Sequence, residues 1–287
     1  PFKLFEMKNY CFIAAAALLS LAACTKNEVR PVSGGPQEIT FQTVVNPQTK
    51  ALGAYQVSFY GDQFKSYAWF LPKGESWAND YSSAKAYISD ATISYTQDAS
   101  GNKIWKDANN TYYWPKQGSL TFFSWTLLAP TTNSADFGKA TSVECSKTNG
   151  LEISYDVAAN KNYDLMVANI AADKSQNENT YEASGVPTLF RHILSKLEFT
   201  VATKDDYAGV EFSLKSITFK NVSCKGTYTQ GVDAAKEAID GVWTLDAQDK
   251  ELSYFDGTSH IAKTPTVVVA NANGYDTVMP QTFRDEN

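Results

Sequence analysis

The stretch Leu120-Thr121-Phe122-Phe123-Ser124-Trp125 is the most informative part of the sequence for the fold. It is strongly apolar and rich in the aromatic residues that favour β-strands. Apolar residues fill nearly every position rather than every second one, which is typical of a strand with both faces covered. The stretch therefore predicts a strand in the middle of a sheet, in a protein built from β-structure.

Shorter strand patterns lie on both sides of this stretch. Ile39, Phe41 and Thr43 alternate with polar residues, which is the period of a half-buried strand. Further strands are expected at 67–71, 88–95, 151–157, 164–168, 210–214 and 266–270, and 104–106 with 112–114 as a hairpin around 107–110. No amphipathic helix of three or more turns follows the N-terminal apolar run. Many short strands separated by turn signals predict β-sandwiches.

A polar segment divides the expected strands into two sets. Residues 173–185 carry a run of polar and charged side chains at 174–179, so we expect an N-terminal β-sandwich over 38–180 and a C-terminal one over 181–287. In the second set, the apolar alternation slips in phase around Ile193-Leu194, which predicts a bulge or kink. A short helical turn is expected over 234–239.

Composition excludes several classes of function. The 287 residues hold 43% hydrophobic and 20% charged residues with a net charge of −6, an ordinary globular balance. The chain is too acidic for a nucleic-acid-binding protein, and no basic stripe is present. It has no G-x-S-x-G, no H-E-x-x-H, no Gly-rich phosphate loop and no Cys/His spacing that suits zinc. We therefore expect neither an enzyme nor a cofactor nor a metal site.

The N-terminal residues have the pattern of a secretory signal. Met7-Lys8-Asn9-Tyr10 supplies a positive head, an apolar run covers 11–21, and Leu21-Ala22-Ala23-Cys24 follows. The run is too short to span a bilayer, which needs about 20 apolar residues. The last four residues resemble the lipobox of bacterial lipoproteins, which implies a leader over 1–23 and acyl chains such as palmitate on Cys24. An ordinary signal peptide with a chance cysteine is the alternative.

The exported part begins with a polar segment and holds few cysteines and histidines. Residues 24–37 are rich in Pro and Gly and are expected to form a flexible tether. Cys145 and Cys224 are expected in different domains as two separate buried thiols, with a disulfide as the alternative. His192 lies within a strand pattern, so we expect a structural rather than a catalytic histidine.

Three stretches together resemble the fimbrillin family of Bacteroidales, the subunits of type V pili. They are 113–124, Asp164-Leu165-Met166-Val167-Ala168 and 189–199, and Met279-Pro280-Gln281 matches a late stop in such chains. The resemblance implies an all-β protein with two transthyretin-like Greek-key β-sandwich domains in tandem. Because the chain stops soon after residue 281, the second domain is expected to be incomplete.

The resemblance also implies a mode of assembly. Family members are exported as lipoproteins to the outer membrane, and a trypsin-like protease then cuts after a basic residue near the first strand. Loss of that strand opens a groove, which a strand of another pilus subunit fills. Here the strand would be 38–45 and the cut would follow Lys50, with Arg30 as the second candidate. The side chains that would plug the groove are Ile39, Phe41, Thr43 and Val45.

The resemblance implies a subunit or accessory component of a surface fimbria that serves adhesion, with host or bacterial surface glycans or proteins as further partners. A glycan-binding outer-membrane lipoprotein of a polysaccharide-uptake system is the alternative. It depends on aromatic rings that would stack on sugars, namely Trp77, Trp105, Tyr112, Tyr113 and Trp114. We favour the interpretation that these rings fill the core of a sandwich.

Overall fold

The computed structural model describes residues 37–45, 59–97, 103–176, 185–270 and 274–282. These residues form an almost entirely β-structure, which confirms the predicted fold class. The strands before residue 175 are β1 (Phe41–Val45), β2 (Gln63–Leu71), β3 (Lys85–Gln97), β4 (Lys103–Asp107), β5 (Ser119–Leu128), β6 (Ser142–Ser146), β7 (Gly150–Asp156), β8 (Asp164–Ala168) and β9 (Ala171–Lys174).

The second half of the chain continues the pattern. Its strands are β10 (Val186–His192), β11 (Ser195–Lys196), β12 (Phe199–Val201), β13 (Phe212–Val222), β14 (Lys225–Thr229), β15 (Val242–Leu245), β16 (Lys250–Ile261), β17 (Thr266–Val268) and β18 (Thr277–Val278). The helical elements are short: α2 (Trp77–Asp80) and the 3-10 turns η1 (Tyr81–Ser83), η2 (Phe137–Lys139) and η4 (Ala238–Asp240). No helix among the described residues has the length and apolar character needed to cross a membrane.

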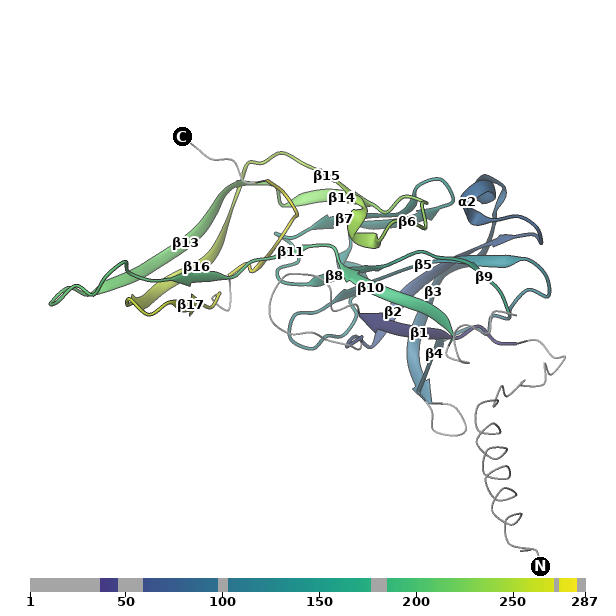
Figure 1. Ribbon diagram of the computed structural model, residues 1–287, viewed down its shortest axis with the longest axis horizontal. Coiled ribbons are helices and arrows are strands. Elements are labelled where there is room, and N and C mark those ends of the chain that lie inside the picture. The colour runs from purple at the N-terminus through teal and green to yellow at the C-terminus, as the bar shows by residue number, and fades with distance from the viewer. Residues whose placement is uncertain (1–36, 46–58, 98–102, 177–184, 271–273, 283–287) are drawn as a thin grey trace, which may run out of the picture. The chain divides into compact units, whose positions relative to one another are not determined.

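The largest sheet closes on itself. Its strand order is β2-β3-β4-β1-β10-β8-β5-β9, and β2 also pairs with β5, from Lys65 opposite Trp125 to Leu71 opposite Ser119. The strands β2, β3, β4, β1, β10, β8 and β5 therefore form a closed ring, with β9 continuing along β5. Figure 1 shows β1 in purple beside β10 in green, although the two are far apart in the sequence.

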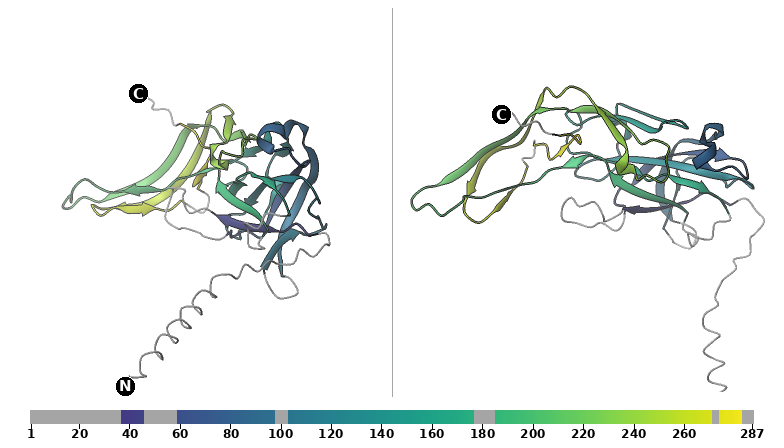
Figure 2. Two further views of the ribbon diagram at one scale, coloured as in Figure 1. Left: turned by 45° about the vertical axis from the view of Figure 1, so that its right-hand side comes forward. Right: turned by 45° about the horizontal axis from the view of Figure 1, so that its top comes forward.

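Smaller sheets complete the structure. A four-stranded sheet has the order β15-β14-β7-β6, and the pairs β11–β18, β12–β17 and β13–β16 form two-stranded ladders. Both views in Figure 2 show the long strands β13 and β16 side by side. The break between β10 and β11 falls at Ile193-Leu194, where the sequence predicted a kink. The 3-10 turn η4 lies at the end of the predicted helical turn.

Strand β5 separates two hydrophobic cores. Leu120, Phe122 and Leu128 belong to one core, and Phe123, Trp125 and Leu127 to the other. The first, which we term the ring core, consists of Ile39, Phe41, Phe59, Phe64, Ala68, Ile88, Ala91, Ile93, Leu120, Phe122, Leu128, Met166, Ala168, Ala171, Val186 and Phe190. The second also receives Ile153 and Tyr155 of β7 and Tyr228 of β14. The predicted strand with both faces covered is thus confirmed.

Strands from beyond residue 181 complete sheets begun before it. β10 pairs with β8, and β14 pairs with β7 from Lys225 opposite Asp156 to Thr229 opposite Glu152. The division into sandwiches over 38–180 and 181–287 stays a prediction. Cys145 and Cys224 are both free thiols. They lie at the same four-stranded sheet, because Cys145 is in β6 and Cys224 directly precedes β14. This placement differs from the expected separate domains because β14 joins β7.

The expected hairpin of 104–106 with 112–114 is wrong. The strand β4 pairs instead with β3, from Ile93 opposite Asp107 to Gln97 opposite Lys103. The residues beyond the expected loop pair with the segment 37–45, where the amide of Ile39 donates to the carbonyl of Tyr112 at 2.8 Å. Within the loop, Asp107 Oδ1 accepts the backbone amides of Asn109 at 2.6 Å and Asn110 at 2.5 Å. Such an Asx turn redirects the chain, and Tyr113 then bridges Glu38 in place of β4.

Candidate functional site

Residues 37–45, which we term the first strand, lie between β10 and β4 in the ring. We term the space that they fill the slot. On one side β1 runs parallel to β10, from Phe41 opposite Val186 to Val45 opposite Phe190. The amide of Val186 donates to the carbonyl of Thr40 at 2.7 Å. Parallel pairing requires a long connection between the two strands. The first strand therefore pairs with a segment that lies far from it in the sequence.

The other edge of the first strand is also bonded. Phe41 lies opposite Trp105 of β4 in an antiparallel bridge. The amide of Ile39 donates to the carbonyl of Tyr112 at 2.8 Å, and the amide of Trp114 donates to the carbonyl of Gln37 at 2.9 Å. Residues 37–45 therefore close the ring, because both of their edges carry backbone hydrogen bonds to neighbours.

Two side chains of this segment reach the ring core. Ile39 and Phe41 are each 3% exposed. The Phe41 ring stands edge-on to Phe64 and to Phe122, with centroid distances of 5.5 Å and 5.7 Å. Thr43 is half-buried, and Val45 belongs to β1 by its backbone pairing. Fully burying a side chain such as Phe41 contributes about 1.5–3 kcal/mol.

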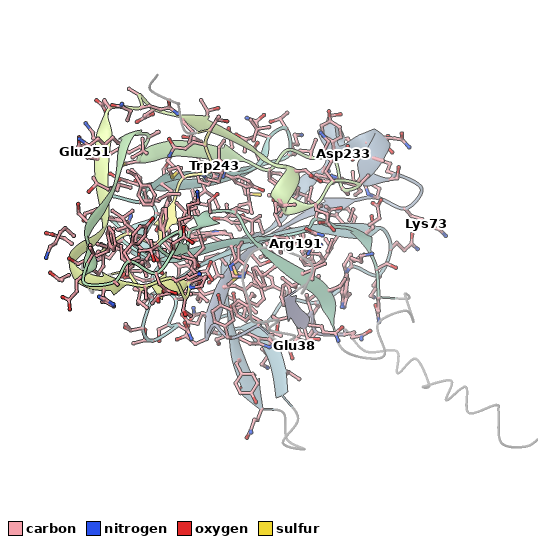
Figure 3. The ribbon with its side chains drawn as sticks, turned by 60° about the vertical axis from the view of Figure 1, so that its left-hand side comes forward. Glu38, Lys73, Arg191, Asp233, Trp243 and Glu251 are labelled. Carbon is pink, nitrogen blue, oxygen red and sulfur yellow. The ribbon has the colours of Figure 1, made fainter. Side chains whose placement is uncertain are left out.

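The outer face of the segment is polar. Glu38 lies at the start of the segment, as Figure 3 shows, and its carboxylate accepts a hydrogen bond from Lys106 Nζ at 3.1 Å. Gln42 is exposed. A half-exposed ion pair of this kind contributes at most about 1 kcal/mol, but it can fix the register of the strand against β4.

Gly185 allows the backbone of β10 to approach the first strand closely. Its φ is +99°, and a Cβ atom there would lie 2.5 Å from the carbonyl carbon and oxygen of Thr40. Only glycine adopts this conformation and leaves this space without strain. Neither Gly185 nor Lys106 was singled out in the sequence, because their roles depend on strand neighbours that sequence periodicity does not identify.

A polar cluster lies where β10 ends. His192 Nδ1 is 2.7 Å from Asp164 Oδ1, and the Tyr60 hydroxyl donates to the other oxygen of the same carboxylate. Burial lowers the pKa of His192, but the hydrogen bond and charge of Asp164 raise it further, so the net shift is upward. Burial raises the pKa of Tyr60. His192 is the last residue of β10, so it lies in a strand as its pattern predicted, and its structural role stays a prediction.

Most of the candidate sugar-stacking rings pack inside the protein. Trp77 is fully buried, and its Nε1 donates to the carbonyl of Val232 at 2.8 Å. Trp105, Tyr112 and Trp114 are half-buried against the ring core. Tyr113, at 44% exposure, is the exposed member of the set. These rings therefore form no shared surface, in line with the favoured core interpretation.

Several predicted sites lie outside the described residues. These are the leader over 1–23, almost all of the tether over 24–37, and Cys24, Arg30 and Lys50. Within the described ranges, no group of three or more His, Cys, Asp or Glu side chains is placed to hold a metal ion. Of the predicted strand-exchange residues, the structure describes Ile39, Phe41 and Thr43 with their side chains, and Val45 by its backbone pairing.

Comparison with known proteins decides the family. A family model described as fimbrillin-like matches residues 61–287. The chain belongs to the fimbrillin-like family. Fimbrillin-like proteins are structural and non-enzymatic, and the family implies a subunit of a surface appendage that associates with other pilus subunits. The matched residues of this fimbrillin-like protein begin after β1.

Solved structures show weaker likeness to the fimbrillin-like chain. One is a candidate cell adhesion protein from Bacteroides uniformis, with 18% identity, a TM-score of 0.41, and coverage of 82% of this chain and 75% of that one. Another is a fimbrial protein from Bacteroides ovatus, with 12% identity, a TM-score of 0.27, and coverage of 84% of this chain and 49% of that one. No curated protein matches the sequence.

Proposed function

We propose that this fimbrillin-like protein is an adhesion-pilus subunit that assembles by protease-triggered strand exchange at the slot of β1. A cut after Arg30, the second candidate, would release only the residues before it, whereas a cut after Lys50 frees the first strand from the rest of the chain. A strand of another pilus subunit then takes its place. The observation that supports the proposal best is that residues 37–45 close the ring through hydrogen bonds on both edges.

Loss of the first strand would leave an unstable structure. The ring core would lose Ile39 and Phe41, and solvent would reach Phe64 and Phe122 beneath them. Each such side chain contributes about 1.5–3 kcal/mol when buried, and each lost backbone hydrogen bond about 0.5–1.5 kcal/mol. These losses are a large part of the free energy of unfolding of a whole domain, which is only about 5–15 kcal/mol. Binding of another strand in the empty slot would restore them.

Strand addition suits the exposed backbone of the slot. With residues 37–45 gone, the edges of β10 and of β4 would both present unpaired amide and carbonyl groups. An incoming strand satisfies these groups with main-chain hydrogen bonds, and its alternate side chains fill the pockets. Glycans have no comparable site among the described residues, so a glycan partner is no part of this proposal.

Before the cut, the lipid on Cys24 would hold the protein on the outer membrane. Several acyl chains anchor a protein stably, whereas one binds only marginally. The tether over 24–37 would then precede the strand directly. A cut after Lys50 would therefore remove the covalent link to the lipid and make the first strand exchangeable in a single step, which couples surface delivery to assembly.

The test is limited trypsin digestion of the protein, followed by sequencing of the new N-terminus and electrophoresis without boiling. We expect a cut between Lys50 and Ala51 and a ladder of heat-sensitive oligomers. The Lys50→Gln variant should stay monomeric, and an added Arg30→Gln change shows whether the second candidate substitutes. Cleaved protein that stays monomeric with other subunits present, or oligomers of the uncut Lys50→Gln variant, would contradict the proposal.

A further inference from the structure

The residues that line the slot restrict which strand can bind there. We infer that it selects a segment of another subunit with a carboxylate, an aliphatic side chain and an aromatic ring at the places of Glu38, Ile39 and Phe41. The order is that of a strand running parallel to β10. This inference rests on the proposed strand exchange and adds a specificity to it.

The aromatic place is the most restrictive. Phe41 contacts Phe64 and Phe122 edge-on at centroid distances of 5.5 Å and 5.7 Å, with interplanar angles of 82° and 86°. Edge-to-face pairs stabilise a ring beyond its area of burial. Aliphatic side chains cannot make these contacts, and a small side chain leaves a cavity between two large rings. The space between Phe64 and Phe122, which we term the Phe64–Phe122 box, therefore favours an aromatic residue.

The acidic place lies on the opposite face. Lys106 extends from β4 and meets the Glu38 carboxylate at 3.1 Å, with both side chains about one third exposed. An incoming strand with a Lys or Arg at this place would bring two positive charges together. Charged side chains at an interface contribute more to choosing the partner and the register than to affinity.

The two places together fix the direction of the strand. The carboxylate must precede the aromatic ring by three residues for Lys106 and the Phe64–Phe122 box to be satisfied at once. A strand of reversed direction would present them in the opposite order. The close approach of Gly185 to the Thr40 backbone also keeps the incoming main chain within the slot.

Beside Thr40 the slot is permissive. A cavity of about 80 Å³ is lined by Gln37, Glu38, Thr40, Trp114, Gly185 and Pro187, among others. It leaves room for a side chain larger than threonine at this place. The pattern expected of an incoming strand is therefore acid, aliphatic, variable, aromatic, in the order of Glu38-Ile39-Thr40-Phe41.

The experiment uses the full chain with a specific protease site at 46–50. After the cut, residues 37–45 are held in the slot only by non-covalent contacts, and labelled peptides are offered to replace them. The reference peptide has the sequence of residues 37–45. Uptake is measured by fluorescence anisotropy for this peptide, for Phe41→Ala, Glu38→Lys and Gln42→Ala peptides, and for one of reversed sequence.

We expect the reference and Gln42→Ala peptides to bind alike, because Gln42 is exposed. The Phe41→Ala peptide should bind at least about a hundredfold more weakly, and the reversed peptide should not bind measurably. The Glu38→Lys peptide should bind about fivefold more weakly, and Lys106→Glu protein should restore its binding. Equal uptake of all peptides would overturn the specificity while leaving strand exchange in place, whereas uptake of none would overturn both.

Discussion

A Cβ atom on Gly185 would lie 2.5 Å from the backbone carbonyl of Thr40, a separation that real Cβ atoms do not show. The segment that leads into β10 is thus fitted against the strand that the proposed maturation removes. The contact involves backbone on the Thr40 side, so it cannot be relieved by a change of rotamer. Residue 185 is for this reason a position at which the docking of the first strand can be weakened selectively.

The Gly185→Ala variant should loosen the first strand. A side chain at φ +99° is strained, and here it also meets the Thr40 backbone. We expect amide hydrogen exchange of Phe41–Val45 to be about tenfold faster or more, with β2 and β5 little changed. Gly74→Ala is the matched control, because its φ is +95° but no atom lies within 4 Å of the added Cβ. Equal acceleration of these amides in both variants would rule out the steric explanation.

The Phe41→Ala variant should lower the free energy of unfolding by about 3–5 kcal/mol, as for other buried phenylalanines. The cause is the cavity left between Phe64 and Phe122 in the ring core. Gln42→Ala, next along the strand but exposed, should change it by less than about 0.5 kcal/mol. Urea denaturation of both variants measures the difference. Similar small losses in both would mean that the first strand does not occupy the slot in solution.

The His192–Asp164 pair should make stability depend on pH. The pKa of His192 is raised on folding, so its contribution is complete below the unfolded pKa of about 6.5. It is lost as pH rises through the higher folded value. Relative to His192→Gln, the wild-type protein should therefore lose stability as the pH rises above about 6.5. Parallel stability curves for the two proteins in this range would contradict the assigned ion pair.

The two described cysteines should be unreactive in the folded protein. Burial raises the pKa of the Cys145 thiol to about 12 and also raises that of Cys224, so little thiolate is present at pH 8. Iodoacetamide should modify both residues slowly in buffer and rapidly in denaturant, as peptide mapping can show separately for each. Rapid modification of either one in buffer would show that its surroundings open.

The sequence predicted the features that depend on local patterns. The continuous apolar run of β5 predicted that both its faces are covered, and alternation in 38–45 predicted that Ile39 and Phe41 share a face, on which both are buried. Both follow from the two-residue period of a strand, which fixes faces without knowledge of neighbours. The phase slip at Ile193-Leu194 marked the end of β10 for the same reason.

These patterns do not predict which strands are neighbours in a sheet. The parallel pairing of Phe41 with Val186 joins positions far apart in the chain, and no spacing in the sequence encodes it. The same limit applies to β14, which extends the sheet of β7, and to Lys106 and Gly185, whose roles exist only beside the first strand. The failed hairpin at 104–114 has the same origin, because its two predicted arms pair with β3 and with the first strand rather than with each other.

The central claim is that departure of the first strand from its slot permits assembly, and a reversible lock tests it most directly. Thr43 and Thr188 are register partners on β1 and β10, so Thr43→Cys with Thr188→Cys places two thiols where a disulfide can form. After cleavage at Lys50, the oxidised protein should stay monomeric and should form heat-sensitive oligomers once a reductant is added. Oligomers of equal amount before and after reduction would contradict the account.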